Sequence, residues 1–121
     1  MKTRIYILSL FIIPFFLSCG NRRIEMISEN SGLILPKHYK VLKNETKSFG
    51  ISDFEVTVII EFKSDSYEIL VAQIDKLADL DNKWQYGDSL IKYFNHLNAS
   101  ETETISINTE LKRLTYKFEH L

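Results

Sequence analysis

The chain is short of the residues on which several classes of small protein depend. Its 121 residues include one cysteine, four glycines and two prolines. A single cysteine excludes the intramolecular disulfide framework that stabilises many small exported domains. Scarce glycine and proline, together with ordinary apolar content, exclude a low-complexity or intrinsically disordered chain. Packing must therefore stabilise the fold, and the length suffices for one hydrophobic core.

The sequence also lacks an excess of basic residues. It holds 15 basic and 16 acidic side chains, a formal net charge of −1. Nucleic-acid-binding domains normally carry a basic patch, so we expect no nucleic-acid partner. The same balance argues against docking of the domain on anionic lipid head groups, which attract clusters of lysine and arginine.

No apolar run marks a stable transmembrane helix. The predominantly apolar run Ile5–Leu17 has about 13 residues, whereas a helix needs roughly 20 to cross the hydrocarbon core. Lys2 and Arg4 precede this run, and the only cysteine, Cys19, follows it closely. A charged start, a short apolar stretch and small residues at the cut site are typical of a secretory signal peptide.

The end of this signal has a recognisable motif. Phe16, Leu17, Ser18 and Cys19 resemble the lipobox of bacterial lipoproteins. This resemblance covers residues 1–20, and the overall pattern of the chain resembles small bacterial lipoproteins of unknown function. That resemblance implies that diacylglycerol is attached to the Cys19 thiol, that the chain is cut before Cys19, and that the new amine is acylated, for example with palmitate. Two or three acyl chains make attachment to a membrane effectively permanent.

The resemblance divides the chain into three parts. We expect a signal peptide over residues 1–18, a lipidated N-terminus and polar tether over 19–32 with at most one docked turn, and one globular domain over 33–121. Removal of the signal leaves 13 basic and 16 acidic side chains, a formal charge of −3. Gly20 stands where many inner-membrane lipoproteins have aspartate, so the resemblance favours the outer membrane, facing the periplasm.

The pattern of the domain predicts an α+β fold. His38–Leu42 is expected as a first strand, with Lys43–Ser52 as a connection. Asp53–Phe62 alternates apolar and polar residues and is the clearest strand, which we expect to pair antiparallel with the first. Asp65 and Glu68 stand at capping-box spacing. They open a helix to about Leu80, whose apolar face recurs at three- and four-residue steps: Tyr67, Leu70, Val71, Ile74, Leu77 and Ala78.

The C-terminal half is expected to complete the sheet. The segment Trp84–Leu97 fits either a strand or a helix with Asp88 as its cap, and we favour a strand because Tyr86–Asp88 reads as a turn. Thr104–Leu121 alternates like a hairpin. The prediction is an antiparallel sheet of about five strands with one helix packed on it, in the order β-β-α-β-β-β.

One tetrapeptide is similar to an enzyme signature. Gly87, Asp88, Ser89 and Leu90 match the motif of GDSL-type hydrolases, in which the serine is the nucleophile. In that family an aspartate and a histidine at Asp-x-x-His spacing activate the serine, but neither His96 nor His120 has an aspartate three residues before it. A serine without an oriented base is not a nucleophile, so we favour turn chemistry as the explanation of the motif.

The three histidines give no metal signature. His38, His96 and His120 show neither the i, i+4 nor the His-x-His spacing of metal sites, so we expect no metal and no cofactor. His96 and His120 fall on strands predicted to be neighbours and could meet across the sheet.

Large aromatic residues gather in the C-terminal half: Trp84, Tyr86, Tyr93, Phe94, Tyr116 and Phe118. They could line a surface for a sugar, a peptide or a protein. A small sheet without disulfides also needs large side chains inside, and we favour that interpretation.

These features favour a membrane-anchored, non-enzymatic binding or accessory module of the cell envelope, held by membrane lipid through acylated Cys19. A protein or peptide partner remains open. One alternative is an inhibitor or immunity-type lipoprotein, which an exposed aromatic or acidic patch on one sheet face would favour. The other is a small serine hydrolase that uses Ser89.

Overall fold

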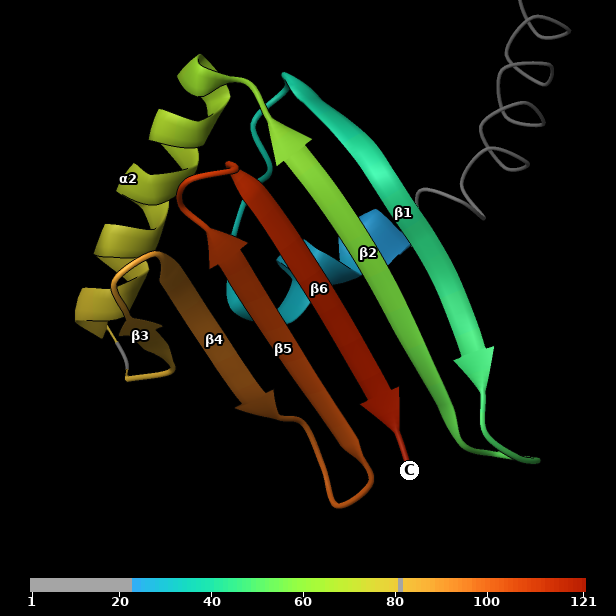
Figure 1. The fold of residues 1–121 in the computed structure, drawn as a ribbon. Helices are drawn as coiled ribbons and strands as arrows, with labels where there is room; N and C mark the ends of the chain where they lie inside the picture. Colours follow the sequence, from blue (N-terminus) through green and yellow to red (C-terminus); the bar gives the residue numbers. More distant parts are fainter. Residues whose placement is uncertain (1–22, 81) are drawn as a thin grey trace, which may run out of the picture.

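Alternating apolar and polar residues build one antiparallel sheet with helices on one face (Figure 1). The computed structural model describes residues 23–80 and 82–121. In this part of the chain the elements are β1 (Tyr39–Ser48), β2 (Phe54–Phe62), α2 (Ser64–Leu80), β3 (Trp84–Tyr86), β4 (Leu90–His96), β5 (Glu101–Asn108) and β6 (Arg113–His120). Residues 23–31 are also helical, and we call them the N-terminal helix.

The strand order places the end of the chain at the centre of the sheet. The order is β1-β2-β6-β5-β4-β3, and all pairings are antiparallel. Neighbouring strands follow one another along the chain except at β2–β6, where the last strand inserts between β2 and β5 (Figure 1). The sheet edges are therefore β1 and β3.

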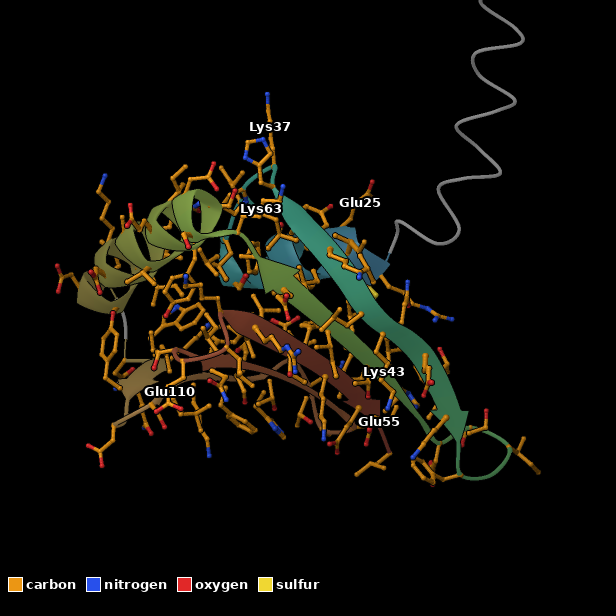
Figure 2. The ribbon with its side chains drawn as sticks, turned by 45° about the horizontal axis from the view of Figure 1, so that its top comes forward. Glu25, Lys37, Lys43, Glu55, Lys63 and Glu110 are labelled. Carbon is orange, nitrogen blue, oxygen red and sulfur yellow. The ribbon has the colours of Figure 1, made fainter. Side chains whose placement is uncertain are left out.

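The core lies between one sheet face and the two helices, which share that side of the sheet (Figure 2). We call this covered side the inner face. On β2 the residues Val56, Val58, Ile60 and Phe62 point inward and are buried. From α2, Leu70 and Ile74 complete the same core, with Tyr67, Leu77 and Ala78 packed around them. The periodic stripe predicted for this helix is confirmed.

The α+β class, the antiparallel sheet, the β1–β2 pairing and the C-terminal hairpin are as predicted. The helix α2 begins at Ser64, so Asp65 lies in its first turn. The hairpin turn between β5 and β6 contains no glycine. Lys112 takes the left-handed conformation there, with φ of 55°, which a glycine would adopt more easily.

The predicted strand count, helix count and element order are wrong. The sheet has six strands because the ambiguous segment Trp84–Leu97 forms two of them, β3 and β4. Gly87 makes this tight turn, and its N–H donates to the Leu90 carbonyl at 2.7 Å. A strand of three residues is too short to show an alternating pattern, so the sequence suggested one element where the structure has two.

The first strand is also longer than expected. Residues 43–48, predicted as a connection, continue β1 and pair in register with β2 from Lys43 opposite Ile59 to Ser48 opposite Phe54. A bulge between Val41 and Lys43 interrupts the pairing once. An edge strand can be polar on both faces, because one side of its backbone meets solvent and little of its surface is covered.

The additional helix is the N-terminal helix, which occupies most of the stretch predicted as a tether. In the N-terminal helix Ile27 is 0% exposed, and Ile24 and Met26 pack against the core. The chain then turns at Gly32, which has a φ of 80° and follows the helix in the position where glycine is favoured. This helix was missed because polar and charged residues surround its few apolar ones.

Candidate functional site

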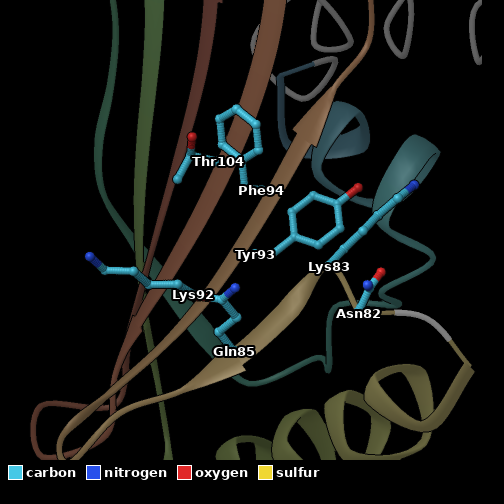
Figure 3. Close-up of a pocket in the computed structure, with 7 residues that line it drawn as sticks. All are labelled: Asn82, Lys83, Gln85, Lys92, Tyr93, Phe94 and Thr104. Carbon is cyan, nitrogen blue, oxygen red and sulfur yellow. The ribbon is translucent and has the colours of Figure 1, made fainter.

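A shallow cleft lies on the outer sheet face beside the short edge strand β3 (Figure 3). We call it the β4 cleft. It arises because β3 ends after three residues, while β4 continues past it with an open edge. Its volume is about 440 Å³, and its lining includes the side chains of Asn82, Lys83, Gln85, Lys92, Phe94 and Thr104.

The described lining of the β4 cleft offers hydrogen-bond donors around one aromatic ring. Phe94 is 56% exposed and lies opposite Thr104 on β5. Lys83 and Lys92 bring ammonium groups, and Gln85 brings an amide. Such a set suits a ligand or partner surface that presents carboxylates, carbonyls or hydroxyls against an apolar patch.

Most of the C-terminal aromatics lie in the core, as favoured from the sequence. Trp84, Tyr93, Tyr116 and Phe118 are buried. Tyr86 and Phe94 are exposed, but they project from opposite faces. Tyr86 donates from its hydroxyl to Asp75 on α2 at 2.5 Å. The exposed aromatic surface of the outer sheet face is therefore Phe94 with His96, whose ring centroid lies 6.5 Å away.

A buried carboxyl group lies under the inner face, and the sequence analysis missed it. Glu103 is 0% exposed. It accepts a hydrogen bond from the Tyr116 hydroxyl at 2.8 Å and another from the Tyr93 hydroxyl at 3.2 Å. The Tyr93 hydroxyl also lies 3.4 Å from the Asn30 carbonyl of the N-terminal helix. The sequence did contain an indication that Glu103 is buried, because Glu103 is in phase with the inward-pointing residues Ile105 and Ile107.

Burial governs the chemistry of this cluster. Desolvation raises the pKa of the Tyr116 hydroxyl far above its ordinary value, and the hydrogen bond to Glu103 raises it further. The two hydroxyls satisfy both oxygens of the carboxyl group, and no described buried side-chain polar atom lacks a hydrogen-bond partner. The three side chains of the cluster are therefore closed to solvent and hydrogen-bonded to one another.

The structure does not bring Ser89 together with either candidate base. Ser89 lies just before β4, whereas His96 ends that strand, about 20 Å away at the rise of an extended strand. His120 pairs with Glu101 at the same far end of the sheet as His96. A serine needs its base within hydrogen-bond distance.

His96 and His120 do not meet either, which corrects the expectation from the sequence. Strand β5 separates β4 from β6, and the pairing registers place the two histidines on opposite faces. The imidazole of His120 stacks on Phe54 with ring centroids 5.3 Å apart, and its Nδ1 lies 3.0 Å from the Ser52 carbonyl.

His38 forms an ion pair with an acidic residue of α2. Its Nδ1 lies 2.8 Å from the Asp65 carboxylate in the first turn of α2. This hydrogen bond is the main cause that lowers the pKa of Asp65 below its ordinary value. Within residues 23–80 and 82–121, no three His, Cys, Asp or Glu side chains come together in a way that could hold a metal ion.

The predicted lipidation residue lies outside the described part of the chain. The predicted signal peptide over 1–18, Cys19 and residues 20–22 are not described. In the parts that are, no helix has the length and apolar character to cross a membrane. No protein-family model, curated protein or solved structure matches this chain, so its function must be argued from its own residues.

Proposed function

We propose that this protein is a lipid-anchored, non-enzymatic binding module of the bacterial cell envelope. The observation that carries the proposal is the apolar run Ile5–Leu17 closing on Cys19, the chain's only cysteine. Acylation of this thiol and of the new N-terminus attaches the mature protein to a membrane. The resemblance to bacterial lipoproteins also favours attachment to the periplasmic side of the outer membrane, because Gly20 stands where inner-membrane lipoproteins often have aspartate.

The geometry of the domain favours binding over catalysis. Ser89 stands at one end of the sheet, and His96 and His120 stand at the other. The serine-hydrolase alternative therefore loses its only candidate bases. The β4 cleft instead presents Phe94, two lysines and amide groups on an uncovered sheet face. An exposed ring within a polar rim is typical of a protein or peptide docking point.

The anchor is tested by intact-mass analysis of the protein purified from detergent-solubilised membranes. We expect the chain to begin at Cys19 and to carry diacylglycerol and an acyl chain. A Cys19→Ser variant should lose the lipid and leave the membrane fraction, whereas a Ser18→Ala control should keep both. An unmodified thiol, or a Cys19→Ser form that stays equally membrane-bound, would contradict the proposal.

A second candidate function is that of an inhibitor or immunity-type lipoprotein, which Phe94 on the outer sheet face supports. The test is cross-linking and pull-down from solubilised membranes, with the anchored protein as bait. A partner that binds through the β4 cleft should be lost with Phe94→Ala and kept with Leu111→Ala. Leu111 is a matched control because it is an equally exposed apolar residue in the β5–β6 turn. A partner enzyme that loses its activity on binding would identify an inhibitor.

A further inference from the structure

The folded body begins very close to the predicted lipid anchor. Arg23 is already part of the N-terminal helix, and its Nη1 donates to Oδ1 of Asn44 on β1 at 2.9 Å. One turn further, Ile27 is fully buried. Cys19 precedes Arg23 by four residues, and four residues reach at most about 14 Å even when fully extended. A lipid on Cys19 would therefore hold the middle of β1 near the bilayer surface.

The chemistry of β1 suits such a position. This edge strand is exposed along most of its length. It carries Lys40, Lys43 and Lys47 against one acid, Glu45, which pairs with Lys43 at 3.5 Å. Figure 2 shows Lys43 on this strand, with Glu55 of β2 labelled nearby. The charge balance of the whole chain argues against docking on anionic lipid, but β1 is a local cationic stripe that this balance does not show, and lysines near a membrane favour anionic head groups.

An apolar turn extends the same edge. Between β1 and β2 the side chain of Phe49 is 59% exposed, and that of Ile51 is as exposed as in an isolated peptide, at 109%. Residues 49–52 include no charged side chain. A polar strand that ends in two bare apolar side chains matches the layering of a membrane surface, where head groups overlie hydrocarbon.

We infer that β1 and the β1–β2 turn form the bilayer-facing side of the anchored protein. The lysines of β1 contact lipid phosphates, and Phe49 and Ile51 enter the boundary between head groups and acyl chains. This inference rests on the proposed lipidation of Cys19 and adds an orientation to it. The open backbone edge of β1 then faces head groups and interfacial water, which satisfy its unpaired N–H and C=O groups.

The orientation has a consequence for binding. Strand β4 is four positions from β1 in the sheet, which is about 19 Å at ordinary strand spacing. The β4 cleft therefore lies at the end of the sheet that is far from the bilayer. Phe94 and its neighbours are presented to proteins in the aqueous compartment, where a partner can approach without displacing lipid.

The test places a fluorescent label on each side of the sheet. Ser48→Cys lies on β1, and Ser89→Cys lies before β4 at the opposite edge; both serines are exposed, and both changes are nearly isosteric. Acylated Cys19 cannot react with the label, so each variant carries one dye. The lipidated full chain is placed in vesicles of phosphatidylcholine and phosphatidylglycerol that contain a head-group quencher lipid. We expect the label at 48 to lose most of its fluorescence and the label at 89 to keep it.

Three results separate the outcomes. A lipidated protein with equal quenching at both positions, or stronger quenching at 89, would overturn the inference and leave the anchor intact. A protein without lipid by intact mass would overturn the anchor and the orientation together. Phe49→Ser with Ile51→Ser, made in the Ser48→Cys background, should lower the quenching at 48. Unchanged quenching in that variant would show that the turn does not enter the membrane.

Discussion

Glu103 is the residue whose placement departs most from the usual rules of burial. Carboxyl groups are almost never fully buried unless they are paired, and here two tyrosine hydroxyls supply the pairing. The cluster joins three strands, since Tyr93, Glu103 and Tyr116 come from β4, β5 and β6. The Asn30 carbonyl links it to the N-terminal helix. A few polar atoms thus connect the sheet to the N-terminal helix.

Replacing this carboxyl group should destabilise the fold. Glu103→Leu leaves the buried Tyr116 hydroxyl without its acceptor, at about 1–3 kcal/mol for the unsatisfied group, whereas the Tyr93 hydroxyl can still turn to the Asn30 carbonyl. Glu103→Gln keeps one acceptor oxygen and should cost less. Urea unfolding measures both variants. Adding Tyr116→Phe to Glu103→Leu should recover part of the loss, and a double variant with fully additive losses would contradict this explanation.

The same cluster makes stability sensitive to alkaline pH. The pKa of Tyr116 is raised in the folded state, first by burial and then by Glu103. The unfolded chain therefore loses this proton first, and the contribution of Tyr116 to stability is full below pH about 10 and falls as the pH rises above it. Urea unfolding across this pH range should show a smaller decline for Tyr116→Phe than for the native chain. Equal declines would contradict the assignment.

At the start of α2 the sign of the pH dependence is reversed. The pKa of Asp65 is lowered from 3.8, chiefly by its hydrogen bond to His38. Its contribution to stability is present above that value and is lost as the pH falls through the folded-state pKa. His38→Ala should raise the pKa of Asp65 toward 3.8, measured by carboxylate chemical shifts in an NMR titration. His96→Ala is the matched control and should leave Asp65 unchanged.

At this scale the sequence predicted the apolar residues of the core better than its polar ones. Alternation placed Val56, Val58 and Ile60 on one face of β2, as observed. It could equally have placed Glu103 inside, but an acidic residue is read as solvent-facing unless its partners are known. Those partners, Tyr93 and Tyr116, come from two other strands, and a pattern along one segment does not reveal pairing across three.

At the scale of single elements, the N-terminal helix matters most for the proposed orientation. If residues 23–31 were a free tether, changes there would leave stability unaltered. Because Ile27 is fully buried, Ile27→Ala should lower the free energy of unfolding by about 2–5 kcal/mol. The exposed Glu25→Ala in the same helix is the control and should change it little. Thermal or urea unfolding measures both, and equal effects would mean that the helix does not pack on the sheet.

Elements with strong periodicity were predictable, and those without it were not. The strand β2 and the helix α2 bury a regular apolar stripe, so their patterns identified them. The strand β1 lies at an edge and gains its structure from pairing with β2, which its own polar residues do not encode. The three residues of β3 pair with β4, and the sequence alone could not show that β3 and β4 are two separate strands.

For the molecule as a whole, we expect cooperative folding to depend on β6, because this strand lies at the centre of the sheet. A chain that lacks residues 113–121 loses the strand that joins β2 to β5, and with it the buried residues Leu114, Tyr116 and Phe118. We expect it to lose cooperative unfolding and near-ultraviolet circular dichroism. A chain that lacks only Leu121, an exposed terminal residue, should keep both. Native-like signals from the shorter chain would contradict this view of the sheet.

The fold class was predictable because strand and helix patterns separate along the chain, whereas the strand order was not. Sequential strands usually pair, which explains β1–β2 and the run from β3 to β6. The sequences of β2 and β6 do not indicate that the two strands are neighbours, because both strands alternate apolar and polar residues in the same way. For the candidate site, the lipobox resemblance pointed to Cys19, while the β4 cleft depends on how far β3 extends.

The position of β6 between β2 and β5 also bears on how the protein folds. Without β6 the sheet can exist only as two unconnected pieces, β1–β2 and β3–β5, and joining them requires a contact between segments far apart in sequence. Pairing between segments far apart in sequence slows folding. We therefore expect the step in which β6 joins these two pieces to limit the folding rate.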